Sequence, residues 1–197
     1  MTFFKMIWLL LFLPFAFAQP WVENTTFLGI QSQCQDLGYS VKISDNGLVA
    51  ISYPCSNSDQ GKVEVYEYFE TTPHWRRFGN SISTGRRSGE QMAFSADGST
   101  VAASFYISHG SITIEKIYVY TYSESTNTWT NTGEMIGRGC SLSDDGKRIA
   151  IHSYDGKNIA RVYKYEDDQW TQIGPDMTGV NGADSSTGYN FVEISGD

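Results

Sequence analysis

The sequence predicts an all-β fold of β-propeller blades, each a sheet of four antiparallel strands, and three observations support this. A motif containing a Ser, a turn that ends in Gly and a short apolar strand recurs through the chain, with its serines at Ser44, Ser95 and Ser143. The residues between the motifs divide into short strands with period-2 apolar patterns, and nothing after residue 18 has a helical period. Four strands in a repeat of roughly 50 residues are typical of propeller blades.

Each repeat begins with a hairpin. Apolar residues alternate along its first strand, as in Val41 and Ile43 or Cys140 and Leu142, which predicts that one side of the strand faces a core. A tight turn follows, because Asn-Gly and Asp-Gly dipeptides tolerate the positive φ of short hairpin loops. The predicted turn residues are Asn46, Gly47, Asp97, Gly98, Asp145 and Gly146. Second apolar strands are then expected at 48–52, 101–104 and 149–151.

Two further strands complete each repeat. The third contains Val or Ile together with Tyr, at 62–68, 116–122 and 161–165. The fourth opens on Trp and closes on Gly, at 75–79, 129–133 and 170–174. Because Trp75, Trp129 and Trp170 recur with the repeat, we expect them to cover the blade faces as packing residues. The repeats therefore span about 38–88, 89–136 and 137–187.

Incomplete pieces flank these three blades within the repeat region 38–197. In the segment 19–37, residues 21–29 resemble an orphan outer fourth strand, and residues 188–197 open a fourth repeat with an orphan first strand. The predicted fold is thus about three complete blades plus a split partial blade. Since closed propellers typically have 4 to 8 blades, we expect a fragment of a longer propeller, or an incomplete ring whose edges pair elsewhere.

Residues 1–18 are predicted to be a secretory signal peptide. Lys5 precedes the apolar run 6–13, Pro14 ends it, and Ala-Phe-Ala at 16–18 offers small residues for cleavage. The run is shorter than the roughly 20 residues that a bilayer span needs, and no later stretch is apolar enough. We expect a secreted mature chain without a membrane span, and Asn24 in Asn-Thr-Thr is a candidate N-glycosylation site.

Composition excludes several other classes of protein. The 197 residues include 14 Lys+Arg and 22 Asp+Glu, for a formal net charge of −8. This acidic balance argues against a binder of nucleic acid or of anionic membranes, which would need a basic stripe. Charged residues make up only 18%, which disfavours a coiled coil, and 14% aromatic residues provide for a core, which argues against wholesale disorder.

No catalytic, cofactor-binding or metal-binding motif is found. The histidines fall in different repeats without metal-ligand spacing: His74, His109 and His152. Asp144 and Asp145 form a carboxylate pair, but Asp145 is at the turn position of Asp97, which is a sufficient conformational reason for it. The sequence lacks G-x-S-x-G, a phosphate-binding loop and H-E-x-x-H. We expect no cofactor and no enzyme, although propeller active sites can gather residues without a local motif.

The three cysteines allow at most one internal disulfide. Cys34 and Cys55 flank the first hairpin, and pairing across that hairpin brings them close enough to make them the candidate disulfide. Cys140 aligns with apolar residues of the other repeats and is expected in the core. The basic doublets at 76–77, 86–87 and 147–148 are expected on solvated edges, with an anion-binding patch as the alternative.

Three segments of the first repeat resemble FG-GAP repeats, the blades of the integrin alpha-subunit propeller. They are Gly-Tyr-Ser-Val at 38–41, Val-Ala-Ile-Ser-Tyr-Pro at 49–54 and Gly-Lys-Val-Glu-Val-Tyr at 61–66. The resemblance covers most of 30–197 and implies extracellular adhesion or recognition. Integrin-type blades often carry a D-x-D-x-D-G calcium loop, which no repeat has, so calcium is not implied.

The predicted function is a secreted or cell-surface, non-catalytic binding or adhesion module. Its partner would be an extracellular protein or glycan, contacted through the variable loops 53–60, 105–111 and 154–158. One alternative is an extracellular polysaccharide-active enzyme with its site in the propeller channel. The other is a truncated fragment without independent function, whose unpaired edge strands would pair with other chains.

Overall fold

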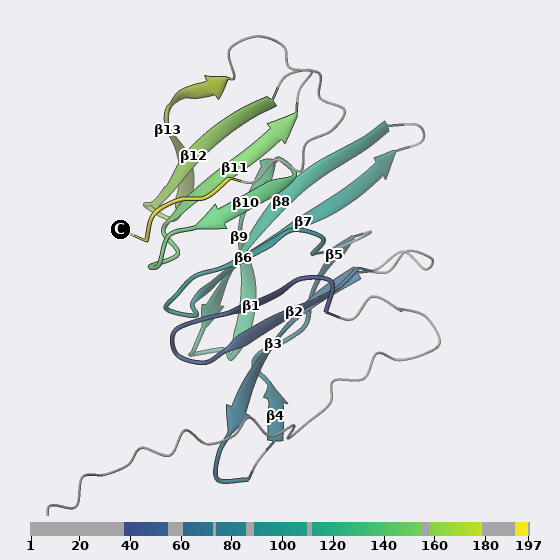
Figure 1. Cartoon of the computed structure of the whole chain (residues 1–197), viewed down its shortest axis with the longest axis vertical. Coiled ribbons are helices and arrows are strands. Elements are labelled where there is room, and N and C mark those ends of the chain that lie inside the picture. The colour runs from purple at the N-terminus through teal and green to yellow at the C-terminus, as the bar shows by residue number, and fades with distance from the viewer. Residues whose placement is uncertain are drawn as a thin grey trace, which may run out of the picture.

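The computed structural model of the chain describes residues 38–54, 61–72, 74–85, 89–109, 112–154, 158–178 and 192–196. These residues form thirteen strands in three antiparallel sheets, which fan out in chain order (Figure 1). None of them is helical, so the all-β prediction is confirmed. Within these ranges there is accordingly no helix with the length and apolar character of a membrane span.

The first sheet has five strands in the order β1-β2-β3-β4, and β5 also pairs with β3. They are β1 (Val41–Ile43), β2 (Val49–Tyr53), β3 (Gly61–Phe69), β4 (His74–Arg77) and β5 (Ile82–Gly85). Because β4 and β5 pair with opposite ends of β3, they act as two halves of one outer strand. The interruption between them contains Gly79, whose φ of 80° is accessible to glycine at little cost.

The second and third sheets each have four strands in sequence order. The second comprises β6 (Met92–Phe94), β7 (Thr100–His109), β8 (Ile112–Ser123) and β9 (Thr128–Ile136). The third comprises β10 (Gly139–Leu142), β11 (Arg148–Tyr154), β12 (Asn158–Glu166) and β13 (Gln169–Thr178). The predicted unit, a meander of four antiparallel strands that repeats along the chain, is therefore confirmed.

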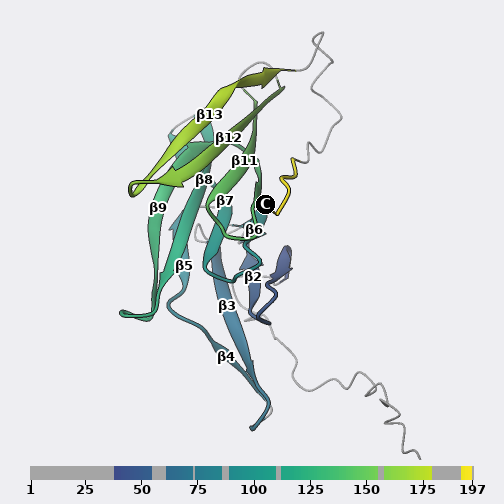
Figure 2. The same cartoon turned by 90° about the vertical axis from the view of Figure 1, so that its left-hand side faces the viewer.

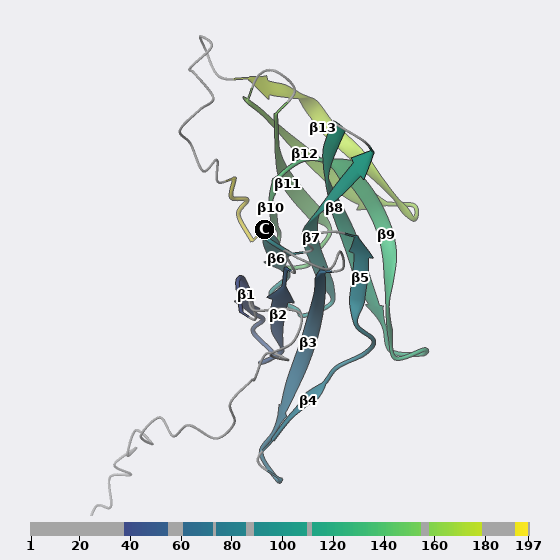
Figure 3. The ribbon, with the colours of Figure 1, turned by 90° about the vertical axis from the view of Figure 1, so that its right-hand side faces the viewer.

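The sheets stack so that equivalent strands lie on the same side. Figure 3 shows β1, β6 and β10 along one side of the molecule, and Figure 2 shows β5, β9 and β13 along the other. The segment 192–196 runs beside β10, where the Ile194 amide donates to Ser141 Oγ at 3.3 Å. This segment therefore occupies the place that the first strand of a fourth repeat would have.

Two apolar cores fill the spaces between the sheets. Successive side chains of β7 point to opposite faces of its sheet and therefore contribute to both cores. Val101 and Phe105 pack toward the first sheet, whereas Ala102, between them in sequence, packs toward the third. The middle sheet is thus buried on both faces. Trp129, on its outer strand, is 4% exposed and belongs to the first core, which confirms its expected packing role.

The first strand of the first sheet departs from the prediction. Val41 and Ile43 were expected to face a core, but they are 53% and 71% exposed. The register pairs Val41 with Ile51 and Ile51 with Glu64, on the face opposite to the one that packs on the second sheet. The expectation was wrong because the alternating pattern is present on a face that no described sheet covers.

The loop expected at 105–111 is also corrected. Residues up to His109 continue strand β7, and Phe105 is completely buried, with its ring edge-on to Tyr118 at 5.0 Å between centroids. Apolar packing thus extends this hairpin beyond the point where the sequence pattern weakens. Residues 55–60, 110–111 and 155–157, which form much of the candidate contact loops, lie outside the described residues.

Candidate binding site

The hairpin turns that join the first and second strands share one geometry. In each, a Gly amide donates to the carbonyl of the Ser three residues earlier, at 3.0–3.1 Å. Only the glycines have positive φ, at 84° for Gly47, 73° for Gly98 and 65° for Gly146. The preceding side chains cap the turns: Ser95 Oγ donates to Asp97 Oδ1 at 2.6 Å and Ser143 Oγ to Asp145 Oδ1 at 2.7 Å. This is a turn closed by a glycine bulge.

Main-chain hydrogen bonds connect these turns from one repeat to the next. The amide of Asp45 donates to the carbonyl of Ala96 at 2.8 Å, and that of Asp97 donates to Asp144 at 3.1 Å. The amide of Asp144 in turn donates to Gly196 at 3.1 Å. We call this series of bonds the turn ladder. It joins all four repeats and holds their innermost strands side by side.

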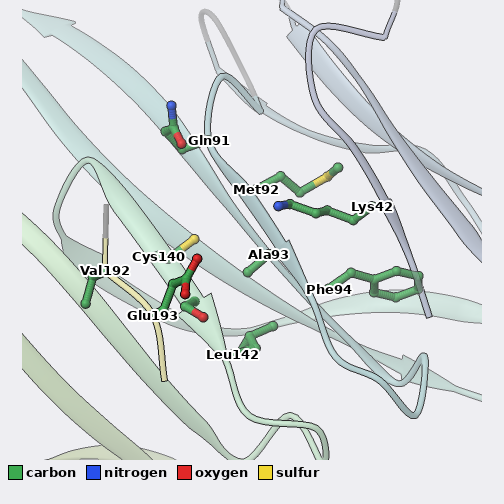
Figure 4. Close-up of a pocket in the computed structure, with 10 residues that line it drawn as sticks. Lys42, Gln91, Met92, Ala93, Phe94, Cys140, Leu142, Val192 and Glu193 are labelled. Carbon is green, nitrogen blue, oxygen red and sulfur yellow. The ribbon is translucent and has the colours of Figure 1, made fainter. Parts of the chain in front are cut away.

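Between these innermost strands lies a hollow of about 190 Å³ (Figure 4). Its walls come from β1, β6 and β10, from Gln91 just before β6, and from Val192 and Glu193 of the C-terminal segment. Figure 4 shows Lys42 entering from the side of β1 and Glu193 from the side of the C-terminal segment. Parts of all four repeats therefore contribute to one site.

The hollow combines polar groups with an apolar wall. Lys42 and Glu193, both exposed, bring one positive and one negative charge, and Gln91 adds an amide. Met92 and Phe94 supply apolar surface. The Phe94 ring also packs against the first core, where it lies edge-on to Trp129 at 6.3 Å between ring centroids. An ammonium, an amide and a carboxylate around an aromatic wall can bind hydroxyl groups and the C–H face of a small polar ligand.

These polar residues were not singled out from the sequence. A repeat alignment contains a signal for two of them, because Lys42 and Glu193 occupy the position that follows the aligned apolar residues Val41 and Val192. In the second and third repeats the same position holds Ala93 and Ser141. Variation at one position of otherwise similar strands could have indicated a site.

Cys140 borders the hollow and packs against the core between the second and third sheets. It is half-buried as a residue, so the expectation of a core position holds only in part. Burial raises the pKa of its thiol to about 12. The thiol is therefore neutral near pH 7 and is a poor nucleophile.

A second polar cluster lies on the outward face of the first sheet around Glu64, which is 4% exposed. Its carboxylate accepts hydrogen bonds from Ser81 Oγ at 2.6 Å and Tyr66 Oη at 2.8 Å, and Lys62 Nζ lies 3.1 Å away. Burial alone would raise the pKa of this carboxyl, but these three partners outweigh it and lower the pKa to about 2. The sequence contains a signal for this cluster, because Glu64 stands between Val63 and Val65 in a predicted strand, but the cluster was not identified from it.

The other residues singled out from the sequence fall into two groups. Asn24, Cys34, Cys55 and the doublet 86–87 lie outside the described residues. Among those described, Arg76 lies 3.5 Å from Glu67 and Arg77 lies 3.4 Å from Glu64, so this doublet is engaged in ion pairs.

The histidines do not converge. The ring of His74 stacks on Phe69, and His152 is buried at 7% exposure, with its Nε2 3.4 Å from Asn158 Oδ1. His109 ends strand β7. Across the described part of the chain, no three His, Cys, Asp or Glu side chains come together in a way that could hold a metal ion.

No protein-family model and no curated protein matches the sequence. Solved structures do resemble the fold. A protein from Bacteroides fragilis assigned as a 6-phosphogluconolactonase has a TM-score of 0.51 and 15% identity, over 71% of this chain and 38% of that chain. A similarly assigned protein from Bacteroides uniformis has a TM-score of 0.50 and 19% identity, over 70% and 39%.

The β-propeller domain of the trilobed protease from Pyrococcus furiosus is also similar, with a TM-score of 0.48 and 13% identity over 73% of this chain and 42% of that domain. Three consecutive antiparallel sheets, joined at their innermost strands by the turn ladder, give the chain the fold of a partial β-propeller. Its three sheets are consecutive blades, and the hollow lies where their first strands meet. This partial propeller spans about two fifths of the length of each of these three structures.

Proposed function

We propose that this partial propeller is a secreted, FG-GAP-like binding module that recognises an extracellular glycan without acting on it chemically. The observation that carries the proposal is the hollow at the first strands of the blades. There Lys42, Gln91 and Glu193 surround the apolar side chains of Met92 and Phe94. Sugar rings present hydroxyl groups at their edges and C–H groups on their faces, and this arrangement offers a partner to both.

Three features of the sequence support an extracellular role. Residues 1–18 have the pattern of a signal peptide, Asn24 lies in a glycosylation triplet, and the first repeat resembles FG-GAP blades. The formal net charge of −8 gives no support to a nucleic-acid partner. A protein ligand and an enzymatic role are the alternatives, the latter because two similar structures are assigned as lactonases.

The test is a glycan array probed with the labelled, secreted chain, followed by titration of any glycan that binds. Lys42→Glu replaces the ammonium group in the hollow by a carboxylate. Lys147→Glu makes the same change of charge in an exposed turn and is the matched control. We expect Lys42→Glu to weaken binding at least roughly tenfold and Lys147→Glu to leave it unchanged.

Two outcomes would contradict the proposal. One is the absence of binding to any glycan on the array, which would favour a protein ligand. The other is an equal effect of both substitutions, which would place the binding surface away from the hollow. Mass spectrometry of the bound glycan gives a separate answer, because cleavage or modification of the glycan would identify an enzyme.

A further inference from the structure

Asn46 makes the first hairpin turn different from the other two. The equivalent side chains, Asp97 and Asp145, are carboxylates, whereas Asn46 carries an amide group that can donate as well as accept. Its Nδ2 donates to the carbonyl of Asp97 in the second blade at 3.0 Å. This bond joins the two turns through a side chain, next to the main-chain bond from Asp45 to Ala96 in the turn ladder.

The side chain of Asn46 is also fixed at its oxygen. Its Oδ1 accepts a hydrogen bond from Ser44 Oγ in the same turn. The amide group packs against the second blade, where a Cβ added to Gly98 would lie 2.7 Å from Asn46 Oδ1 and 2.8 Å from its Nδ2. A carboxylate at this position would present only acceptor oxygens to the carbonyl of Asp97, so the side-chain link depends on the amide group.

Asn46 is followed by Gly47, and this pair can react with itself. The main-chain nitrogen of the glycine can attack Cγ of the asparagine, because no Cβ on the glycine hinders the approach. A C–N bond forms, the bond from Cγ to Nδ2 breaks, and ammonia leaves, which produces a succinimide ring. One water then opens the ring to give aspartate, or isoaspartate with the main chain running through Cγ. The reaction therefore consumes one water, releases one ammonia and involves no oxidant or reductant.

Both reacting groups are engaged in the folded chain. The amide of Gly47 donates to the carbonyl of Ser44 at 3.0 Å. The amide group of Asn46 bonds to Ser44 Oγ and to the carbonyl of Asp97. The nitrogen can reach Cγ only after these bonds open, so the rate should follow local opening of the turn.

We propose that the pair Asn46 and Gly47 is a deamidation site, protected by its contacts with the second blade, whose reaction loosens the first blade from the second. Aspartate replaces the donor by an acceptor that faces the carbonyl of Asp97. Isoaspartate lengthens the main chain directly after Asp45, whose amide makes the neighbouring link of the turn ladder. The proposal is independent of glycan binding, because neither product requires a ligand in the hollow.

Peptide mass spectrometry of the secreted chain, kept in mildly alkaline buffer with and without urea, tests the protection. The other Asn-Gly pair of the chain, Asn181 and Gly182, lies outside the described residues and is the internal standard for the unfolded chain. In urea we expect both pairs to deamidate at similar rates. Without urea, Asn46 should react at least roughly tenfold more slowly than in urea. An equal rate at Asn46 in the two buffers would overturn the proposal.

Two substitutions separate displacement of Asn46 from general destabilisation. Gly98→Ala places a methyl group against the amide group of Asn46, whereas Gly146→Ala makes the same change in the next turn, where the Cβ meets Thr100. Both glycines have positive φ, at 73° and 65°. We expect deamidation at Asn46 to accelerate roughly tenfold in Gly98→Ala and to change little in Gly146→Ala. Equal rates in the two variants would contradict the protective role of the Asn46 contacts.

Asn46→Asp reproduces the aspartate product and tests the loosening. Hydrogen–deuterium exchange at the amides of 41–45 should accelerate roughly threefold in this variant, because the side-chain link to the second blade is lost. Asn131→Asp is the matched control, since Asn131 is also exposed and its Oδ1 accepts from the amide of Gly133 at 3.1 Å, a bond that a carboxylate keeps. Unchanged exchange in Asn46→Asp, or the same acceleration in Asn131→Asp, would overturn the proposed loosening.

Discussion

The indole nitrogen of Trp129 lies 3.0 Å from the carbonyl oxygen of Phe78 and donates a hydrogen bond to it across the boundary between two blades. The amide of Trp129 also donates to Asn80 Oδ1 at 2.6 Å. Both acceptors lie in the interruption between β4 and β5. The irregular part of the first blade's outer strand is therefore the part that receives the second blade.

This relationship predicts a large loss of stability for Trp129→Ala. We expect the free energy of unfolding to fall by about 3–5 kcal/mol, because a buried aromatic ring is removed from the core. Trp129→Phe keeps an aromatic ring but loses the hydrogen bond, and it should lower the free energy of unfolding by less than Trp129→Ala does. Urea denaturation followed by circular dichroism measures both, and similar losses for the two variants would contradict the packing role.

Glu64 predicts an acid-dependent loss of stability. Its pKa is lowered from 4.5 to about 2 in the folded chain, so the stabilisation is complete above pH 4.5 and is lost as the pH falls toward 2. This shift corresponds to roughly 3 kcal/mol. Denaturant titrations across this range should show that loss in the parent chain and a smaller one in Glu64→Gln. The same change at exposed Glu193 is the control, and a pH dependence unaltered by Glu64→Gln would contradict the prediction.

The turn glycines predict a difference between two similar substitutions. Gly146→Ala and Gly47→Ala both place a side chain at positive φ, at 65° and 84°. At Gly146 the new Cβ would also lie 2.5 Å from Thr100 Oγ1 of the preceding blade, whereas Gly47 has open space. We expect Gly146→Ala to lower the free energy of unfolding by about 1–3 kcal/mol more than Gly47→Ala does. Thermal or urea unfolding measures this difference. Equal costs would mean that the turns do not pack against each other.

The cysteines predict a pattern of chemical labelling. Because burial raises the pKa of the Cys140 thiol to about 12, iodoacetamide at pH 8 should label it slowly in the folded chain and rapidly in denaturant. Non-reducing peptide mass spectrometry should find Cys34 linked to Cys55, as their spacing around the first hairpin predicts. Rapid labelling of folded Cys140, or free thiols at both other cysteines, would contradict these expectations.

The repeat made most of the fold predictable. Alternation identified strands such as β7, and the recurrence of Ser, Gly and Trp gave the number of blades and the order of their strands. The same alternation could not show that Val41 and Ile43 are exposed, because strand patterns do not reveal whether a neighbouring sheet covers a given face.

The candidate site was harder to predict because it is formed by distant parts of the sequence. Lys42 and Glu193 line one hollow only because the turn ladder holds the first strands of successive repeats side by side, and neither residue belongs to a local motif. The close approach of Trp129 to Gly79 likewise joins residues of different repeats. The recurring Trp and Gly were visible in the sequence, but their contact became apparent only from the stacking of the blades.

The turn ladder has a consequence for how such a protein can diversify. Its links use backbone atoms, so they impose few requirements on side chains beyond a residue that permits the turn. The ladder thus holds the inner edges of neighbouring blades together, while Trp129 joins the first two blades at their outer strands. Side chains around these turns can therefore change without breaking the links, so the repeats can diverge in sequence while their inner edges stay together.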